Sequence, residues 1–538
     1  MSRPVNFLMF ITDQLRADHL GCYGNRVVQT PNIDAISKKG FRLDNMHVAT
    51  PICMPNRASM MTGRYPSVHG ARHNGIPLSL KARTFVETLR LSGYQTAQVG
   101  KIHLQNMTAL APLWPQDPAD RLCDEAFEAD NGNYEQEKRG KWLDSDHYDL
   151  DYPYYGFEQV YLVDDHADIV HGHYRYWLRR EVPNAESLIG PDNAIPAPDY
   201  KLTRIGQAWR TRLTVEQYPS AYIADRSIDL LNDYAGSEQP FFLQVSFPDP
   251  HHPFTPPGQY WDMYKPEDMA LPASFYSDHE PPQHVQWLYQ RRDSGAATKK
   301  GTAVFACDER EAKEALALNY GSISNIDAQI GRVMAELERL GLQDNTIVIF
   351  TSDHGDFLGD HQLMLKGPIH YRGLTRVPFI WSDPTMPAAA NKVSGALAST
   401  IDIAPTVLAR ARVPAFNGIQ GQDMQPLMDG RSNGLRDSLL IEEEGQRVIL
   451  SIDTRVRCRT LLTQRYRMTI YDAASWGELY DLQNDPDEMI NLWETPAASN
   501  IRAMMMEKLA YTNLELVEKS PIQVLWPDSD RWPTIPTQ

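Results

Sequence analysis

Four short apolar segments, far apart in the chain, each lead into side chains that bind metal ions or transfer protons. The segments are 5–11, 94–99, 241–247 and 346–350, and they precede Asp13, Lys101 and His103, Asp249 and His251, and Asp353 and His354. Apolar runs without alternation are typical of strands that are buried on both faces of a parallel sheet. Because ligands bind beyond the carboxyl ends of such strands, we expect these polar residues to gather at one sheet edge.

Helical periodicity between these segments indicates an α/β domain, which we assign to residues 1–413. Apolar residues recur every three or four positions from Ile323 to Leu340, and Gly341 follows as a helix cap before the run at 346. Residues 105–240 are aromatic and acidic without clear periodicity, which predicts an insertion that folds over the sheet edge and shapes substrate choice. Residues 258–302, rich in Pro, Asp, Gln and Ser, predict surface loops.

The pattern changes after Pro414, so we predict a smaller α+β domain over residues 414–538. Short apolar or alternating runs at 438–441, 447–452 and 466–471 are separated by turn residues, which favours an antiparallel sheet with a helix. The tail from Ser520 is rich in Pro and Trp. Either it packs on its own domain or it contacts a neighbouring subunit and supports a homo-oligomer.

Net charge and cysteine usage exclude several classes of protein. The formal charge of -17, from 52 basic and 69 acidic residues, argues against a nucleic-acid or anionic-membrane partner. An anionic substrate would therefore need a local cluster of cations. The five cysteines are scattered and lack CxxC spacing, so neither a disulfide framework nor a structural zinc site is indicated. With no long apolar segment at the N-terminus or elsewhere, the sequence predicts a cytoplasmic protein.

The most informative motif is Cys53-Met54-Pro55-Asn56-Arg57. Pro55 suits a first helical turn and Gly63 a helix end, so Cys53 is expected at a helix N-terminus. Backbone N–H groups and the helix dipole favour an anion there. A cysteine in that position is, by itself, more often structural or at most a thiol of low pKa.

The wider context of this motif resembles the signature of the sulfatase branch of the alkaline phosphatase superfamily. Cys-x-Pro-x-Arg is followed by Ala-Ser-x-x-Thr-Gly-Arg-Tyr-Pro and His69-Gly70. Further ordered matches are Thr12-Asp13-Gln14-Leu15-Arg16, Thr30-Pro31-Asn32-Ile33-Asp34, Gly100-Lys101-Ile102-His103, Pro250-His251-His252-Pro253-Phe254, Ser352-Asp353-His354-Gly355-Asp356 and Glu478-Leu479-Tyr480-Asp481-Leu482. The resemblance implies an alkaline phosphatase-like fold and arylsulfatase-like hydrolysis of sulfate monoesters. It also implies that a formylglycine-generating enzyme converts Cys53 to Cα-formylglycine, whose hydrated aldehyde is the nucleophile.

The same resemblance implies one divalent metal ion. Asp13 and Asp353 offer hard oxygen ligands, His354 a nitrogen ligand and Gln14 a carbonyl oxygen, with the modified Cys53 also at the ion. Each aspartate alone is equally compatible with a turn after a strand. Family sulfatases usually carry Asp in place of Gln14 and often Asn in place of His354. This departure favours Mn²⁺ over the usual Ca²⁺, with Ca²⁺ or Mg²⁺ as alternatives, and is similar to phosphonate monoester hydrolases.

Catalytic roles follow from the matched motifs. By resemblance, Arg57 and Lys101 orient and stabilise the formylglycine diolate, and His103 accepts the proton whose removal releases sulfate. His251 and Lys366 face the ester oxygen, and one of them assists departure of the alcohol. The Lys101-x-His103 pair favours sulfate over phosphonate.

Several alternatives stay open. Asn74 matches a substrate-binding position of the family, although an Asn before Gly is ordinarily a turn residue. His171-Gly172-His173 resembles a metal pair only superficially, so we expect packing or substrate contact there. The alternative activity is hydrolysis of phosphonate monoesters or phosphodiesters by the same nucleophile. The non-enzyme alternative is a catalytically silent binding protein of the same fold.

Overall fold

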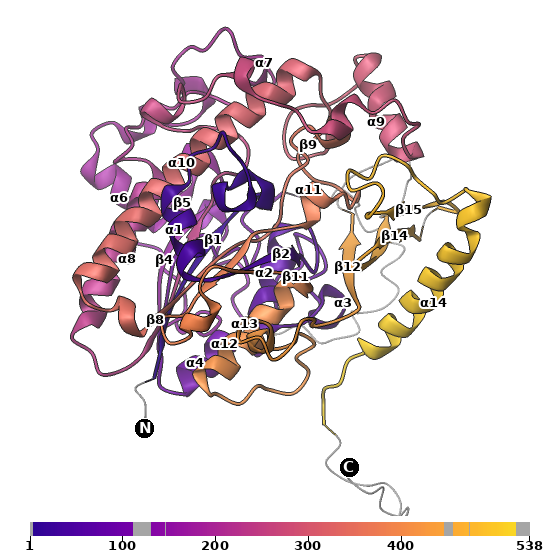
Figure 1. Cartoon of the computed structure of the whole chain (residues 1–538). Coiled ribbons are helices and arrows are strands. Elements are labelled where there is room, and N and C mark those ends of the chain that lie inside the picture. The colour runs from indigo at the N-terminus through magenta and orange to yellow at the C-terminus, as the bar shows by residue number, and fades with distance from the viewer. Residues whose placement is uncertain (1–3, 111–130, 146, 446–455, 473, 523–538) are drawn as a thin grey trace, which may run out of the picture.

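A nine-stranded, mostly parallel sheet forms the centre of the computed structural model, which describes residues 4–110, 131–145, 147–445, 456–472 and 474–522 (Figure 1). The strand order is β11-β2-β10-β8-β1-β6-β3-β4-β5. The strands are β1 (Asn6–Thr12), β2 (Phe41–His47), β3 (Gln95–Gly100), β4 (Gln159–Asp164), β5 (His171–Gly172), β6 (Phe241–Phe247), β8 (Thr346–Ser352), β10 (Phe379–Ser382) and β11 (Lys392–Ser399). Only β5 and β10 run antiparallel to their neighbours in this sheet. The predicted α/β class is confirmed.

Strand β1 lies at the centre of the sheet and is buried along its whole length. It pairs in parallel with β6 on one side and β8 on the other. Leu8 and Phe10 face one hydrophobic core, whereas Phe7, Met9 and Ile11 face a second core on the opposite side. Burial on both faces is the physical reason why this run shows no alternation of apolar and polar residues.

Helices cover both faces of the sheet. One core includes residues of α1 (Pro31–Lys39), α6 (His173–Glu181), α8 (Pro219–Ala235) and α10 (Glu309–Arg339), and the other includes residues of α2 (Cys53–Thr62), α4 (Phe85–Leu91) and α12 (Ile403–Ala411). Helices α8 and α10 pack against each other (Figure 1). Shorter helices are α3 (Pro66–His69), α5 (Arg139–Leu143), α7 (Lys201–Arg204), α11 (Arg372–Thr375) and α13 (Gln425–Met428).

Helix α10 confirms the predicted helix before the run at 346, but it begins much earlier than the apolar periodicity. It starts with a capping box, in which Glu311 N donates to Asp308 Oδ1 and Asp308 N donates to Glu311 Oε2, both at 2.9 Å. Its first half buries small residues such as Ala312 and Ala315. Because alanine contributes little to an apolar pattern, the sequence indicates the helix only from Ile323 onward.

The two irregular stretches contain more regular structure than their sequences indicate. Residues 105–240 contribute β4 and β5 to the sheet edge beside β3, and α8 packs on β6. Their role in substrate choice stays a prediction. In 258–302 the expectation of surface loops alone was wrong, because α9 (Gln283–Asp293) forms there. Val285 and Leu288 anchor this helix in a small core, and His284 is buried beside them.

The C-terminal part forms a separate four-stranded antiparallel sheet beside the large one (Figure 1), as predicted. Its strands are β12 (Ser438–Glu444), β13 (Arg457–Thr463), β14 (Tyr466–Tyr471) and β15 (Gly477–Asp481), followed by α14 (Ser499–Glu515). The predicted run 447–452 and the tail from residue 523 lie outside the described residues. The boundary at 413 and the homo-oligomer stay predictions. None of the described helices combines the length and the hydropathy that crossing a bilayer requires.

Candidate active site

The residues that follow four central strands lie together at one edge of the large sheet. Asp13 follows β1, Lys101 follows β3 and Asp353 follows β8. Lys101 Nζ lies 2.7 Å from Asp13 Oδ2, and Gln14 N donates to Asp353 Oδ1 at 3.1 Å. His251, four residues after β6, joins them through Lys366, whose Nζ lies 3.1 Å from His251 Nε2. Parallel strands that end at the same edge therefore assemble this cluster.

Cys53 is the first residue of α2 and is 2 % exposed. Its Sγ lies 2.8 Å from Lys366 Nζ, 3.1 Å from His354 Nε2 and 3.8 Å from Asp13 Oδ1. Burial and Asp13 act to raise the pKa of the thiol, but Lys366 and His354 outweigh them and lower it from its usual value. The surroundings of Cys53 thus favour an anion at this position.

Arg57 lies one turn after Cys53 on α2 and connects three strand ends. Its Nε donates to Asp353 Oδ2 at 2.7 Å, and its Nη1 donates to the Lys101 carbonyl and to Ser246 Oγ, both at 2.9 Å. A guanidinium with these fixed partners orients the Asp353 carboxylate. The other Asp353 oxygen, Oδ1, then faces Gln14 N and the region of His354.

Four donor groups fit a divalent metal ion. The donor atoms of Asp13, Cys53, Asp353 and His354 lie within 4.8 Å of one another, and all four residues are buried. His354 Nδ1 lies 2.7 Å from the Gly355 carbonyl, so Nδ1 carries the proton and donates it there. That bond leaves the Nε2 lone pair for a cation, which is the arrangement of most histidine ligands.

Gln14 supplies an unpaired oxygen to the same cluster. Its Nε2 lies 3.1 Å from His252 Nδ1 and also donates to Asp356, so the amide nitrogen has its partners. The Oε1 atom is buried and has no hydrogen-bond partner among the described residues. Gln14 also has a left-handed backbone, with a φ of 66°, which is uncommon for a residue other than glycine. An unsatisfied buried acceptor and a strained backbone are both typical of functional sites.

Two further predicted residues lie close to this cluster. His103 is buried, and its Nδ1 has no hydrogen-bond partner in the part of the chain that the structure describes. Burial, Lys101 and Arg57 together hold its pKa well below the usual value. A neutral imidazole with a free nitrogen is the form that accepts a proton. Asn74 Oδ1 accepts a hydrogen bond from Met54 N at 3.3 Å, which places it at the N-terminus of α2.

His166 is a member of the cluster that the sequence reasoning missed. Its Nε2 lies 2.7 Å from Lys101 Nζ, and its ring stacks on His251 at a centroid distance of 3.6 Å. The neighbours Asp165 and Ala167 both have positive φ angles, of 82° and 56°. The sequence did contain a signal, because residues 159–164 form another strand that runs into polar residues. His166 Nε2, Asp13 and His251 could also hold a cation, but Lys101 Nζ already lies beside two of them.

His171 and His173 do not join the cluster through any described contact. His171 Nε2 lies 2.9 Å from the Glu137 carbonyl, and His173 Nδ1 accepts from Leu162 N at 2.9 Å. Each ring thus has a backbone partner of its own. These contacts agree with a packing role and offer no shared metal position.

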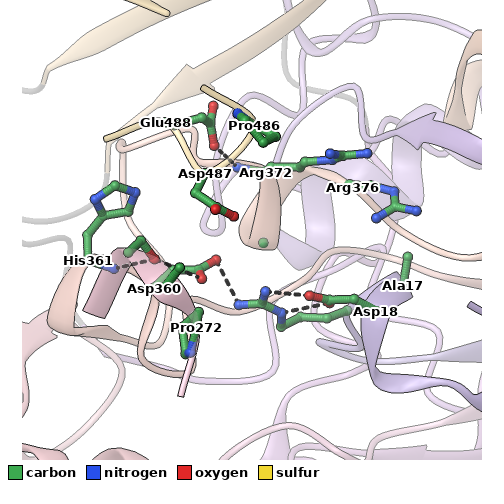
Figure 2. A pocket seen from close by; sticks show the side chains of 14 residues that line it. Ala17, Asp18, Pro272, Asp360, His361, Arg372, Arg376, Pro486, Asp487 and Glu488 are labelled. Carbon is green, nitrogen blue, oxygen red and sulfur yellow. Dashed lines mark hydrogen bonds and ion pairs between the residues drawn. The ribbon is translucent and has the colours of Figure 1, made fainter. Parts of the chain in front are cut away.

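A separate cavity of about 290 Å³ lies where the loop after β1 meets the C-terminal domain (Figure 2). Charged residues dominate its walls: Arg16, Asp18, Asp360, Arg372, Arg376, Asp487 and Glu488. Arg16 pairs with Asp18 at 2.7 Å and with Asp360 at 2.8 Å. None of the predicted catalytic residues lines this cavity, so its walls do not describe the substrate position.

Comparison with known proteins places this geometry in a family. The Sulfatase family matches residues 5–413, and the family described as N-sulphoglucosamine sulphohydrolase, C-terminal, matches residues 359–515. An arylsulfatase of Clostridium perfringens (strain 13 / Type A) is 28% identical over 494 residues, which cover 90% of each chain. The multifunctional alkaline phosphatase superfamily protein PehA of Trinickia caryophylli is 29% identical and covers 94% of this chain and 95% of the relative.

A solved structure agrees in fold. The phosphonate monoester hydrolase of Agrobacterium radiobacter gives a TM-score of 0.74 at 24% identity, covering 96% of this chain and 97% of that one. Members of the sulfatase family generally use a metal ion and a formylglycine, and the cluster around Cys53 offers ligands for such an ion. Because the family match spans residues 5–413, the chain belongs to the sulfatase family of the alkaline phosphatase superfamily and is a sulfuric ester hydrolase.

Proposed function

We propose that the protein hydrolyses sulfate monoesters, in the manner of an arylsulfatase, at Cys53. The observation that carries this proposal is the local concentration of positive charge in a chain whose formal charge is -17. Lys366 contacts Cys53 Sγ directly, while Arg57 and Lys101 are held beside it by Asp353 and Asp13. Such preorganised cations stabilise the charge that spreads over the sulfuryl oxygens in the transition state.

We propose Asp13, Gln14, Asp353 and His354, with the modified Cys53, as ligands of one divalent ion, Mn²⁺ or Ca²⁺ first and Mg²⁺ as an alternative. The side-chain oxygens of Asp13, Gln14 and Asp353 suit all three ions, and the imidazole of His354 favours Mn²⁺ among them. The ion would supply further charge neutralisation beside the nucleophile. Conversion of Cys53 to formylglycine by a maturation enzyme would supply a hydroxyl oxygen as the nucleophile.

The chain's own residues divide the remaining tasks. Arg57 and Lys101 hold the carboxylates of Asp353 and Asp13 in place. Lys366 and His251, 3.1 Å apart, are proposed to bind the ester oxygen and assist the departing alcohol. His103, with its free Nδ1, is the proposed base for the release of sulfate.

Phosphonate monoesters are the second candidate substrates. The specific observation that favours them is the ligand pair Gln14 and His354, in which a neutral amide replaces the usual carboxylate and an imidazole replaces the usual Asn. A phosphonate monoester carries one negative charge, as a sulfate monoester does, so the same cations can bind it. A phosphate monoester dianion carries more charge and is expected to be a poorer substrate.

Matched aryl esters test this proposal. With one aryl alcohol as the common leaving group, we expect kcat/KM for the sulfate to exceed that for the methylphosphonate by at least about 10-fold, which corresponds to about 1.4 kcal/mol. The phosphate monoester should be slower than either. The Cys53→Ala protein, purified in parallel, measures contaminating hydrolases. A clear preference for the phosphonate would replace the proposed activity by the second candidate.

A second variant tests the contribution of His166. Because its ring stacks on His251 and its Nε2 contacts Lys101, His166→Ala should let both side chains move. We expect kcat to fall by roughly 10- to 100-fold with a smaller change in KM, since misplaced groups affect the transition state most. His147→Ala, an exposed histidine of the same region, is the matched control. Unchanged kcat in His166→Ala would remove His166 from the site.

A further inference from the structure

A second group of side chains that could hold a metal ion lies where the segment after β9 meets the C-terminal sheet, and it shares no residue with the cluster around Cys53. His370 Nε2 lies 3.0 Å from Glu443 Oε2 and 3.6 Å from Cys458 Sγ. All three residues are at most 2 % exposed. His370 belongs to the segment between β9 (Leu363–Met364) and α11, only four residues after Lys366. Glu443 and Cys458 belong to β12 and β13.

The backbone fixes this arrangement. Glu443 and Cys458 are directly paired in the antiparallel register of β12 and β13, so their side chains project from the same face of the sheet. Thr460, two residues after Cys458, shares that face, because side chains alternate along a strand. Three ligand atoms therefore converge from two paired strand positions and one opposing loop.

The histidine is already oriented as a metal ligand would be. His370 Nδ1 lies 2.8 Å from Thr460 Oγ1, which in turn lies 2.7 Å from Thr469 Oγ1. A hydrogen bond at Nδ1 directs Nε2 toward Glu443 and Cys458. Support of this kind at the second ring nitrogen is usual for histidines that bind metals.

The donor set selects a class of ion. Thiolate, imidazole and carboxylate together suit Zn²⁺ and similar transition ions, whereas Ca²⁺ and Mg²⁺ prefer oxygen alone. A tetrahedral zinc with bonds of about 2.0 Å to N or O and 2.3 Å to S has ligand atoms roughly 3.3 to 3.6 Å apart. The two observed separations, 3.0 and 3.6 Å, are close to these edges.

The charges of the three side chains also favour a divalent ion. Glu443 and Cys458 both face the His370 ring, and all three side chains are buried. When a dication binds, Cys458 loses its proton to solvent, and the thiolate and carboxylate together cancel the two positive charges. The bound group is then a neutral, buried unit.

We propose that His370, Glu443 and Cys458 bind one zinc-type ion, with a non-protein ligand in the fourth position. This ion would fasten the segment that carries Lys366 to the C-terminal sheet. The site is distinct from the proposed catalytic ion in its ligands and in its preferred metal. It does not depend on which ester the protein hydrolyses.

Metal analysis of the full chain, produced in zinc-supplemented medium and dialysed against metal-free buffer, tests the proposal. We expect about one zinc per chain in the wild type and close to none in Cys458→Ala and Glu443→Gln. Cys307→Ala, which removes a buried cysteine elsewhere, should keep its zinc. Asp353→Asn should also keep it, because that variant changes only the other site. Wild-type protein without bound zinc, or Cys458→Ala with full zinc, overturns the proposal.

Cobalt substitution gives an absorption spectrum of the wild-type site, and this spectrum does not depend on how the variants fold. Co²⁺ bound to the wild type at this site should give a thiolate-to-cobalt charge-transfer band and the strong visible absorption of tetrahedral cobalt. The bands should persist in Asp353→Asn and vanish in Cys458→Ala. If saturating Co²⁺ produces no thiolate band in the wild type, His370, Glu443 and Cys458 form only a hydrogen-bonded group.

Discussion

Cys53→Ala is expected to lower kcat/KM for an aryl sulfate by about 10⁴-fold or more, as removal of a nucleophile does in other hydrolases. Lys366 Nζ, His354 Nε2 and Asp13 Oδ1 all face the Cys53 side chain, and each contact is lost when that side chain ends at Cβ. The backbone of α2 keeps its Pro55 and Gly63 ends, so the fold should persist. Steady-state kinetics with circular dichroism separates the two effects.

The control for this variant is Cys307→Ala, which removes a buried cysteine that contacts no predicted catalytic residue. It should retain near-normal activity. The mass of the peptide that contains position 53 should also be lower than that of the unmodified cysteine peptide in active enzyme. Near-normal turnover by Cys53→Ala, or full activity of enzyme with unmodified cysteine, would contradict the nucleophile assignment.

Asp353→Asn should lower both the metal affinity and kcat by more than about 100-fold. Asp353 is a proposed direct ligand, and mutation of residues that only support metal ligands already costs up to about 100-fold. Arg57 also loses its ion pair, since its Nε lies 2.7 Å from Asp353 Oδ2. Elemental analysis and activity on the same sample test the coupling.

Excess Mn²⁺ or Ca²⁺ should partly restore the Asp353→Asn variant, and the ion that does so best identifies the natural class. Asp344→Asn, at an exposed position before β8, is the matched control and should bind metal normally. Full activity of Asp353→Asn without a bound ion would show that the catalytic site needs no metal at this carboxylate.

Four strands of the large sheet, β1, β3, β6 and β8, were predictable because burial on both faces leaves a continuous apolar run. The predicted run 241–247 coincides with β6, and 346–350 falls within β8. Their polar ends gave Asp13, Lys101 and Asp353 without reference to any family. Lys366 follows a strand of only two residues, β9, so no pattern marks it, and only the family resemblance found it.

Other features depend on tertiary contacts that leave little trace in the sequence. His166 was missed because the apolar run before it, residues 160–163, is only four residues long and lies in a stretch without clear periodicity. Helix α9 was missed because only two of its three buried residues, Val285 and Leu288, are apolar, and the third is His284. The pairing of Glu443 with Cys458 depends on the register of β12 and β13, and scattered cysteine spacing gave no indication of it.

Strand β1 lies at the sheet centre, and one of its two neighbouring strands is synthesised long after it. Its partner in β8 lies 340 residues later, since Asn6 pairs with Thr346. At about 5 to 20 residues per second, a ribosome needs roughly 17 to 70 s to produce that interval. For Cys53 the relevant interval is the 301 residues up to His354, which take roughly 15 to 60 s at the same rate. Until then Cys53 lacks the contacts with His354 and Lys366 that later bury it. The proposed maturation enzyme would have this interval for access to the nascent chain.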